Sequence, residues 1–145
     1  MVISGNVLPE RFVRAIKNES LERKVGSWQL KKNYDSLGNE LETELDQVWS
    51  TYQEILEANL ELPKHFHNDG VYGQQSEYKD EPGFIEDIVD FTHIVEFSIS
   101  GDGAPFCFDF RHDEEKPEII WWDDLYWRKI SGSFEDFISL FAGIS

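Results

Sequence analysis

The residues best suited to chemistry are five carboxylates in the second half of the chain: Asp109, Asp113, Glu114, Asp123 and Asp124. They follow or end segments that we expect to be neighbouring strands, so adjacent turns could bring them together. Paired carboxylates act as general acid and base in hydrolases. The competing interpretation is a solvated loop face, because charge is most easily hydrated on turns. The sequence pairs no nucleophile with a base, so we expect a protein that is not an enzyme.

Asp109 differs from the other four acids because it lies inside an apolar segment, between Phe108 and Phe110. On a strand its side chain points away from both aromatic rings. Arg111 lies on the same face as Asp109, and we expect a salt bridge between the two.

Metal and cofactor sites are poorly supported by the sequence. His65, His67 and Asp69 offer ligand atoms within one polar segment, but a second ligand cluster is missing. The chain has no glycine-rich phosphate loop, no Gly-x-Ser-x-Gly, no Cys-x-x-Cys and no His-Glu-x-x-His. Its lone Cys107 stands between Phe106 and Phe108, as a small buried residue would. We expect no metal and no cofactor.

Residues 119–128 concentrate three Trp and one Tyr among acids. One interpretation places these rings over the core, because a small protein must bury most of its Trp area. The other leaves one or two exposed as anchors for a partner, with acids at the rim. The candidate partner-binding residues are accordingly Asp109, Asp113, Glu114, Trp122, Asp123, Asp124 and Tyr126.

The formal net charge is -16, and it is unevenly distributed. Residues 1–36 contain 7 Lys and Arg against 4 Asp and Glu, whereas residues 37–145 contain 6 against 25. A surface this negative repels nucleic acid and anionic membranes and attracts basic proteins at long range. Solubility alone is the alternative explanation of the charge. We expect neither a nucleic-acid nor a membrane partner.

Apolar spacing in the first half predicts two helices. One begins at Pro9 and covers residues 9–16, and the other covers residues 45–60 and is closed by Leu62-Pro63. Residues 28–30 alternate as in a short strand, and residues 35–39 have the composition of a turn. Residues 65–83 are polar and predict a long loop with a partial strand at most.

The second half changes to the composition of strands. Residues 92–100, 105–110 and 119–121 predict an antiparallel meander, and Ser133 caps a final amphipathic helix. This order predicts one α+β domain over residues 1–145, with an antiparallel sheet flanked by N-terminal and C-terminal helices. The chain lacks a long apolar run and a signal-peptide pattern, so we expect a cytoplasmic protein.

Residues 91–141 contain three motifs: a Phe-Asp segment after a glycine turn (residues 103–111), a Pro-x-Ile-x-Trp-x-Asp strand end (residues 117–124) and a Ser-Phe-x-x-Phe helix start (residues 133–137). Together these motifs resemble the SUKH superfamily. The first half has the expected Leu-Pro-x-x-aromatic helix at residues 8–12, but Asn18-Glu19-Ser20 replaces the usual glycines. The resemblance implies a sheet wrapped by helices, no catalysis, and binding through the sheet or its edge loops.

That superfamily includes bacterial immunity proteins, which neutralise toxins, and fungal regulators of cell-wall synthesis. The resemblance and the charge together favour an immunity protein that binds a basic toxin domain, for example a nuclease. An intracellular regulatory or scaffolding module is the alternative. Pairing of two copies at an edge strand also stays open.

Overall fold

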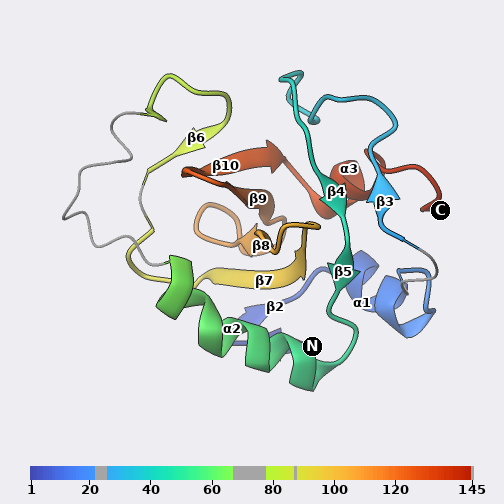
Figure 1. Cartoon of the computed structure of the whole chain (residues 1–145). Helices are drawn as coiled ribbons and strands as arrows, with labels where there is room; N and C mark the ends of the chain where they lie inside the picture. The colour runs from blue at the N-terminus through green and yellow to red at the C-terminus, as the bar shows by residue number, and fades with distance from the viewer. Residues whose placement is uncertain (22–25, 67–77, 87, 145) are drawn as a thin grey trace.

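The computed structural model describes residues 1–21, 26–66, 78–86 and 88–144 and confirms the predicted α+β fold. Its centre is a six-stranded sheet in the order β5-β7-β8-β9-β10-β6. All neighbouring strands in this sheet are antiparallel. The strands are β5 (Gln47–Val48), β6 (Phe84–Ile85), β7 (Ile94–Ile99), β8 (Pro105–Asp109), β9 (Glu118–Asp123) and β10 (Tyr126–Ser131). Figure 1 shows this sheet with helices beside and behind it.

Short elements from the first half surround the sheet. The two-residue strands β1 (Val2–Ile3) and β2 (Asn6–Val7) pair with each other, as do β3 (Trp28–Gln29) and β4 (Glu44–Leu45). The helices are α1 (Glu10–Lys17), α2 (Tyr52–Phe66) and α3 (Phe134–Ile138).

The helices α1 and α3 cover one face of the sheet with an aromatic core. Phe12 of α1 meets the rings of Phe97, Phe108 and Phe134, with centroids 5.3 to 5.5 Å apart. Phe97 and Phe108 stack on adjacent strands at 4.2 Å. The helix boundaries follow from the sequence, because Pro9 precedes α1 and the Ser133 hydroxyl accepts a hydrogen bond from the Asp136 amide at 3.1 Å.

The opposite face of the sheet is covered by the end of α2 and by the segment before β7. Leu62, Ile88 and Ile94 pack there against Cys107, Ile120 and Trp127. Cys107 is fully buried, and burial raises the pKa of its thiol well above the ordinary value. The lone cysteine is therefore a core residue, as its sequence context indicates.

The predicted helix over residues 45–60 is wrong at both ends. Leu45 and Val48 lie in strands because they pair with Trp28 and Ser98, which are distant in sequence. The helix instead begins at Tyr52, where the Thr51 hydroxyl accepts from the Glu54 amide at 3.1 Å. It continues through Pro63 to Phe66, so the expected end at Leu62-Pro63 is also wrong.

Candidate functional site

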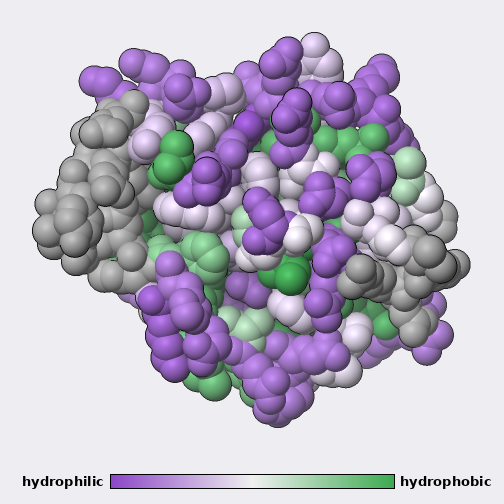
Figure 2. Space-filling model, viewed as in Figure 1, coloured by the Kyte–Doolittle hydropathy of each residue, from purple (hydrophilic) through white to green (hydrophobic). Residues whose placement is uncertain are grey.

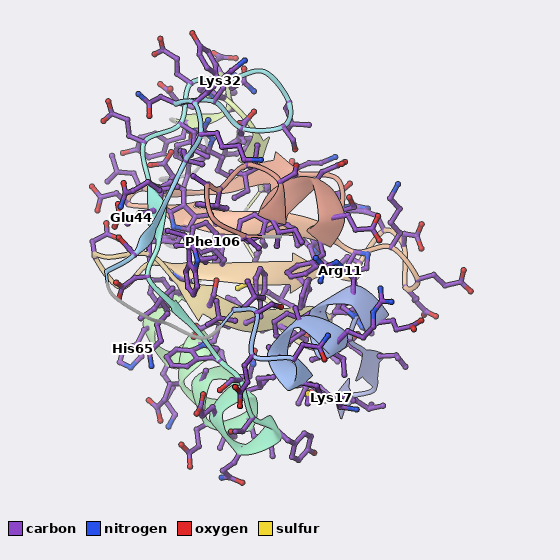
Figure 3. The ribbon with its side chains drawn as sticks, turned by 90° about the vertical axis from the view of Figure 1, so that its right-hand side faces the viewer. Arg11, Lys17, Lys32, Glu44, His65 and Phe106 are labelled. Atoms are coloured by element: carbon purple, nitrogen blue, oxygen red, sulfur yellow. The ribbon has the colours of Figure 1, made fainter. Side chains whose placement is uncertain are left out.

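The five sequence-predicted carboxylates do not converge. The β8–β9 turn, with Asp113 and Glu114, and the β9–β10 turn, with Asp124, lie at opposite ends of β9. A strand of this length separates its two ends by about 20 Å. Successive turns of an antiparallel meander lie at alternate ends of the strands. One shared cluster of the five acids is therefore excluded, which leaves the alternative interpretation of a solvated loop face for the acids on the two turns. Figure 3 shows the two ends, with Glu44 near one and Arg11 near the other.

Acids and bases are mixed at the Asp113 end. The Asp113 carboxylate accepts the backbone amides of Glu115 and Lys116 at 2.9 and 3.0 Å, which holds the turn. A hollow beside this turn is lined by Glu10, Arg11, Arg14, Glu115, Lys116 and Glu135, among others. Glu114 is exposed nearby. Because cations and carboxylates alternate here, this end offers a weak field to a charged partner.

Asp109 is buried, with 1 % of its surface exposed. Its two carboxylate oxygens accept Nε and Nη2 of Arg111 at 2.9 and 2.8 Å, which is the salt bridge expected from the strand pattern. This bond raises the pKa of Arg111. Asp109 is therefore a buried ion-pair residue, and we do not include it in the partner-binding surface proposed below.

Within the described residues, one group has ligand atoms spaced for a metal ion: Asp109, His112 and Glu118, within 4.8 Å of one another. Both carboxylates already have cationic partners, because Arg111 binds Asp109 and Lys129 binds Glu118 at 3.0 Å. An ion would have to displace these side chains, so we assign the group to an ion-pair network. The histidine hypothesis places only His65 in the described region, 3.4 Å from Glu61, while His67 and Asp69 lie outside it.

Two aromatic candidates serve the fold. Tyr126 is buried, stacks on Tyr78 at 5.8 Å and donates its hydroxyl to the Pro82 carbonyl at 2.9 Å. Burial raises the pKa of Tyr126 to about 12. Trp122 is half-buried and meets the rings of Phe66 and Trp127 at 5.8 and 5.5 Å. Most of the surface of both side chains is therefore covered by other residues, in agreement with the interpretation that the aromatic rings cover the core.

At the other end of β9, one arginine ties a loop to the sheet. Arg128 donates to Asp35 and to Asp123 at 3.0 Å each, and also to the Glu40 carbonyl. Burial works against the charge of Arg128, but the hydrogen bonds to both carboxylates raise its pKa. The other oxygen of Asp35 accepts the amides of Leu37 and Asn39, which confirms the predicted turn. The loop over residues 33–42 is thus fixed against the end of the sheet.

This fixed loop creates an acidic surface. A hollow of about 580 Å³ between the loop and the sheet is lined by Asn33, Tyr34, Glu40, Leu41, Glu42 and Asp123. Asp124 follows on the β9–β10 turn, and Glu44 reaches the β7–β8 turn, where it accepts the Gly101 amide at 2.7 Å. We call Glu40, Glu42, Glu44, Asp123 and Asp124 the acidic rim. Three of the five, Glu40, Glu42 and Asp124, are exposed.

Apolar side chains accompany the acidic rim. Tyr34, Leu37 and Leu125 each expose between 46 and 54 % of their surface. Figure 2 shows this end of the sheet toward the viewer, with hydrophilic residues over its upper part and along its lower margin and paler or hydrophobic residues between them. Acids around partly exposed apolar groups are suited to a protein interface, in which charge steers encounter and apolar contact supplies affinity.

Sequence reasoning missed Glu40, Glu42 and Glu44. Their sequence spacing of two was visible, but Glu40 and Glu42 share a hollow with Asp123 only in the folded chain, where Arg128 binds Asp35, 93 residues away. It also missed Glu96, although a carboxylate inside the apolar segment Ile94-Val95-Glu96-Phe97 was a usable signal.

Comparisons with known proteins identify a family. The model of the SMI1 / KNR4 family (SUKH-1) matches residues 8–140. No curated protein and no solved structure matches. No helix in the described part of the chain is long and apolar enough to cross a membrane.

Proposed function

Because the chain belongs to the SMI1 / KNR4 family (SUKH-1), we propose that it is a non-catalytic domain that binds a basic protein through its acidic rim. The observation that carries the proposal is the fixed position of the rim. Arg128, Asp35 and Asp123 hold the loop in place before any partner arrives. A preformed surface loses little conformational entropy on binding.

The most specific form of this function is toxin immunity. A toxin that acts on nucleic acid is electropositive around its active site, because it must bind phosphates. An acidic rim would dock on that site and exclude the substrate. The net charge of -16 would accelerate association and make it sensitive to salt. The partner-binding residues in this proposal are the exposed members of the rim, with Leu125 and Tyr34 as apolar contacts.

A regulatory or scaffolding module is the second candidate, because the superfamily that the sequence motifs resemble also includes fungal regulators of cell-wall synthesis. The same surface would serve, with an intracellular basic protein in place of the toxin. The two candidates differ in the partner and in what binding does to it.

The experiment uses the whole chain as bait at low salt, elutes with rising salt and identifies the eluted proteins. Each basic partner is then expressed in cells with and without this chain. Immunity predicts that the partner alone stops growth and that co-expression restores it. A partner that is harmless when expressed alone would contradict immunity and favour the regulatory module.

A further inference from the structure

A second hollow, away from the acidic rim, lies between α2 and the edge of β7. Its volume is about 330 Å³, and it is lined by Trp49, Glu54, Glu57, Ala58, Glu61, Leu62, His65, Phe66 and Glu96. Apolar side chains form one part of this groove and four carboxylates the other. We call it the Glu96 groove.

The position of Glu96 in the groove is fixed from two sides. On one side Glu96 pairs with Cys107 of β8, and on the other its backbone is hydrogen-bonded to the Asn59 side chain of α2. Strand β5 pairs with β7 through Gln47 and Val48, and the Trp49 amide donates to the Phe97 carbonyl at 2.9 Å. Beyond this point α2 lies along the edge of β7. There the Asn59 side chain accepts the Glu96 amide at 2.8 Å and donates to the Glu96 carbonyl at 3.0 Å. The edge of β7 is thereby closed, and the Glu96 side chain lies between α2 and the sheet.

Glu96 is buried, with only 6 % of the residue exposed. Among the residues that the structure describes, none of the ion pairs includes its carboxylate. Within the described part of the chain its side chain has one hydrogen bond, from the Trp49 indole Nε1 to Oε2 at 2.9 Å. Burial raises the pKa of Glu96 to about 7, and the Trp49 bond opposes this only in part. Proteins seldom bury an unpaired carboxylate, and such groups concentrate at functional sites.

We propose that the Glu96 groove binds the ammonium end of a lysine side chain from a partner protein. The methylene stem would lie along Trp49, Leu62 and Phe66, while the ammonium would meet Glu96 with Glu57 and Glu61 nearby. Lysine fits better than arginine, because Trp49 already occupies Oε2 and the planar guanidinium fork prefers both oxygens. The identity of the partner that carries the lysine rests on the proposed function, whereas binding of an ammonium group depends only on the residues of the groove.

The effect of Glu96 on the pH dependence must be distinguished from the effects of the other ionisable groups at the groove. From α2 these are Glu54, Glu57, Glu61 and His65, and His65 lies 3.4 Å from Glu61. From β8, Cys107 is the cross-strand partner of Glu96. A lysine needs the ionised carboxylate, so binding should strengthen as pH rises through 7. The same pH dependence should persist in His65→Gln and disappear in Glu96→Gln.

The test titrates tri-lysine into ¹⁵N-labelled protein at pH 8 and follows the Trp49 indole signal, which reports on the hydrogen bond to Glu96. We expect a saturable shift for the wild type. The affinity for tri-lysine obtained from it should fall at least tenfold in Glu96→Gln and several-fold in the exposed double variant Glu57→Gln/Glu61→Gln. Glu115→Gln removes one equal charge at an exposed position outside both the groove and the acidic rim, and it should bind within twofold of the wild type. Tri-norleucine should produce no saturable shift.

The inference is overturned if Glu96→Gln binds tri-lysine as the wild type does, or if Glu115→Gln weakens binding equally. Tri-arginine binding as tightly as tri-lysine would overturn the choice of lysine. These outcomes are independent of the proposed function, because the titration uses no partner protein. If rim variants lose partner binding but still bind tri-lysine, the groove and the fold are intact in those variants.

Discussion

Replacing Glu96 with Gln should change how the stability of the protein depends on pH. The substitution keeps the size of the side chain and the oxygen that accepts the Trp49 indole, but it removes the charge. Since the folded protein raises the pKa of Glu96 from 4.5 to about 7, the folded state binds this proton more tightly than the unfolded chain does. Stability contributed by this group is therefore present at low pH and falls as pH rises from about 4.5 to about 7.

The size of the effect follows from the pKa. Each pKa unit corresponds to about 1.4 kcal/mol, so an ionised Glu96 costs about 3 kcal/mol of unfolding free energy above pH 7. Between pH 5.5 and 8.5 the wild type should lose about 2 kcal/mol relative to Glu96→Gln, since part of the cost is already present at pH 5.5. The discount for solvent screening is small because only 6 % of Glu96 is exposed.

Urea unfolding followed by tryptophan fluorescence at several pH values between 5.5 and 8.5 measures this difference. The groups other than Glu96 are common to both proteins and cancel in the comparison. Glu114→Gln, which removes the same charge from an exposed position, should differ from the wild type by a constant amount. If the wild type and Glu96→Gln have parallel stability profiles, Glu96 is ionised without cost and our account of the groove is refuted.

Three further substitutions test the fold around the sites by urea unfolding at pH 7. Arg128→Met should cost about 3 to 5 kcal/mol, because it leaves Asp35 buried without its cation; a loss below about 1 kcal/mol would contradict the role of Arg128. Ser133→Ala should cost about 1 kcal/mol through loss of the α3 cap, and an unchanged midpoint would show that the cap is dispensable. Gly83→Ala should cost more than about 1 kcal/mol, since the residue has a φ of +68° and a Cβ would collide with the Lys129 carbonyl; wild-type stability would show that the turn adapts.

The parts of the fold that were predictable are those with local causes. Pro9 and Ser133 mark helix starts, and the β-branched and aromatic segments after Thr92 correspond to strands β7, β8 and β9. Strand β10 was missed, because its Trp127 and Arg128 were interpreted as part of an aromatic cluster. Leu45 and Val48 were assigned to a helix because their strand partners, Trp28 and Ser98, are set by tertiary pairing.

The candidate site was less predictable than the fold. Alternation of turns in a meander already implies that Asp113 and Asp124 lie apart, so convergence of the five acids could have been excluded from the sequence. The acidic rim was not accessible in the same way, because it depends on Arg128 binding both Asp35 and Asp123. Long-range ion pairs of this kind leave no periodic pattern in a sequence.

The central claim is that the acidic rim, rather than net charge alone, binds a basic partner. The most direct measurement compares the affinity of the captured partner for two charge-reversed variants, Glu40→Lys/Glu42→Lys at the rim and Glu114→Lys/Glu115→Lys at the opposite end of the sheet. All four positions are exposed, and both variants change the net charge equally. We predict at least a tenfold loss for the rim variant and less than a threefold loss for the other. Equal losses in the two variants would contradict the claim.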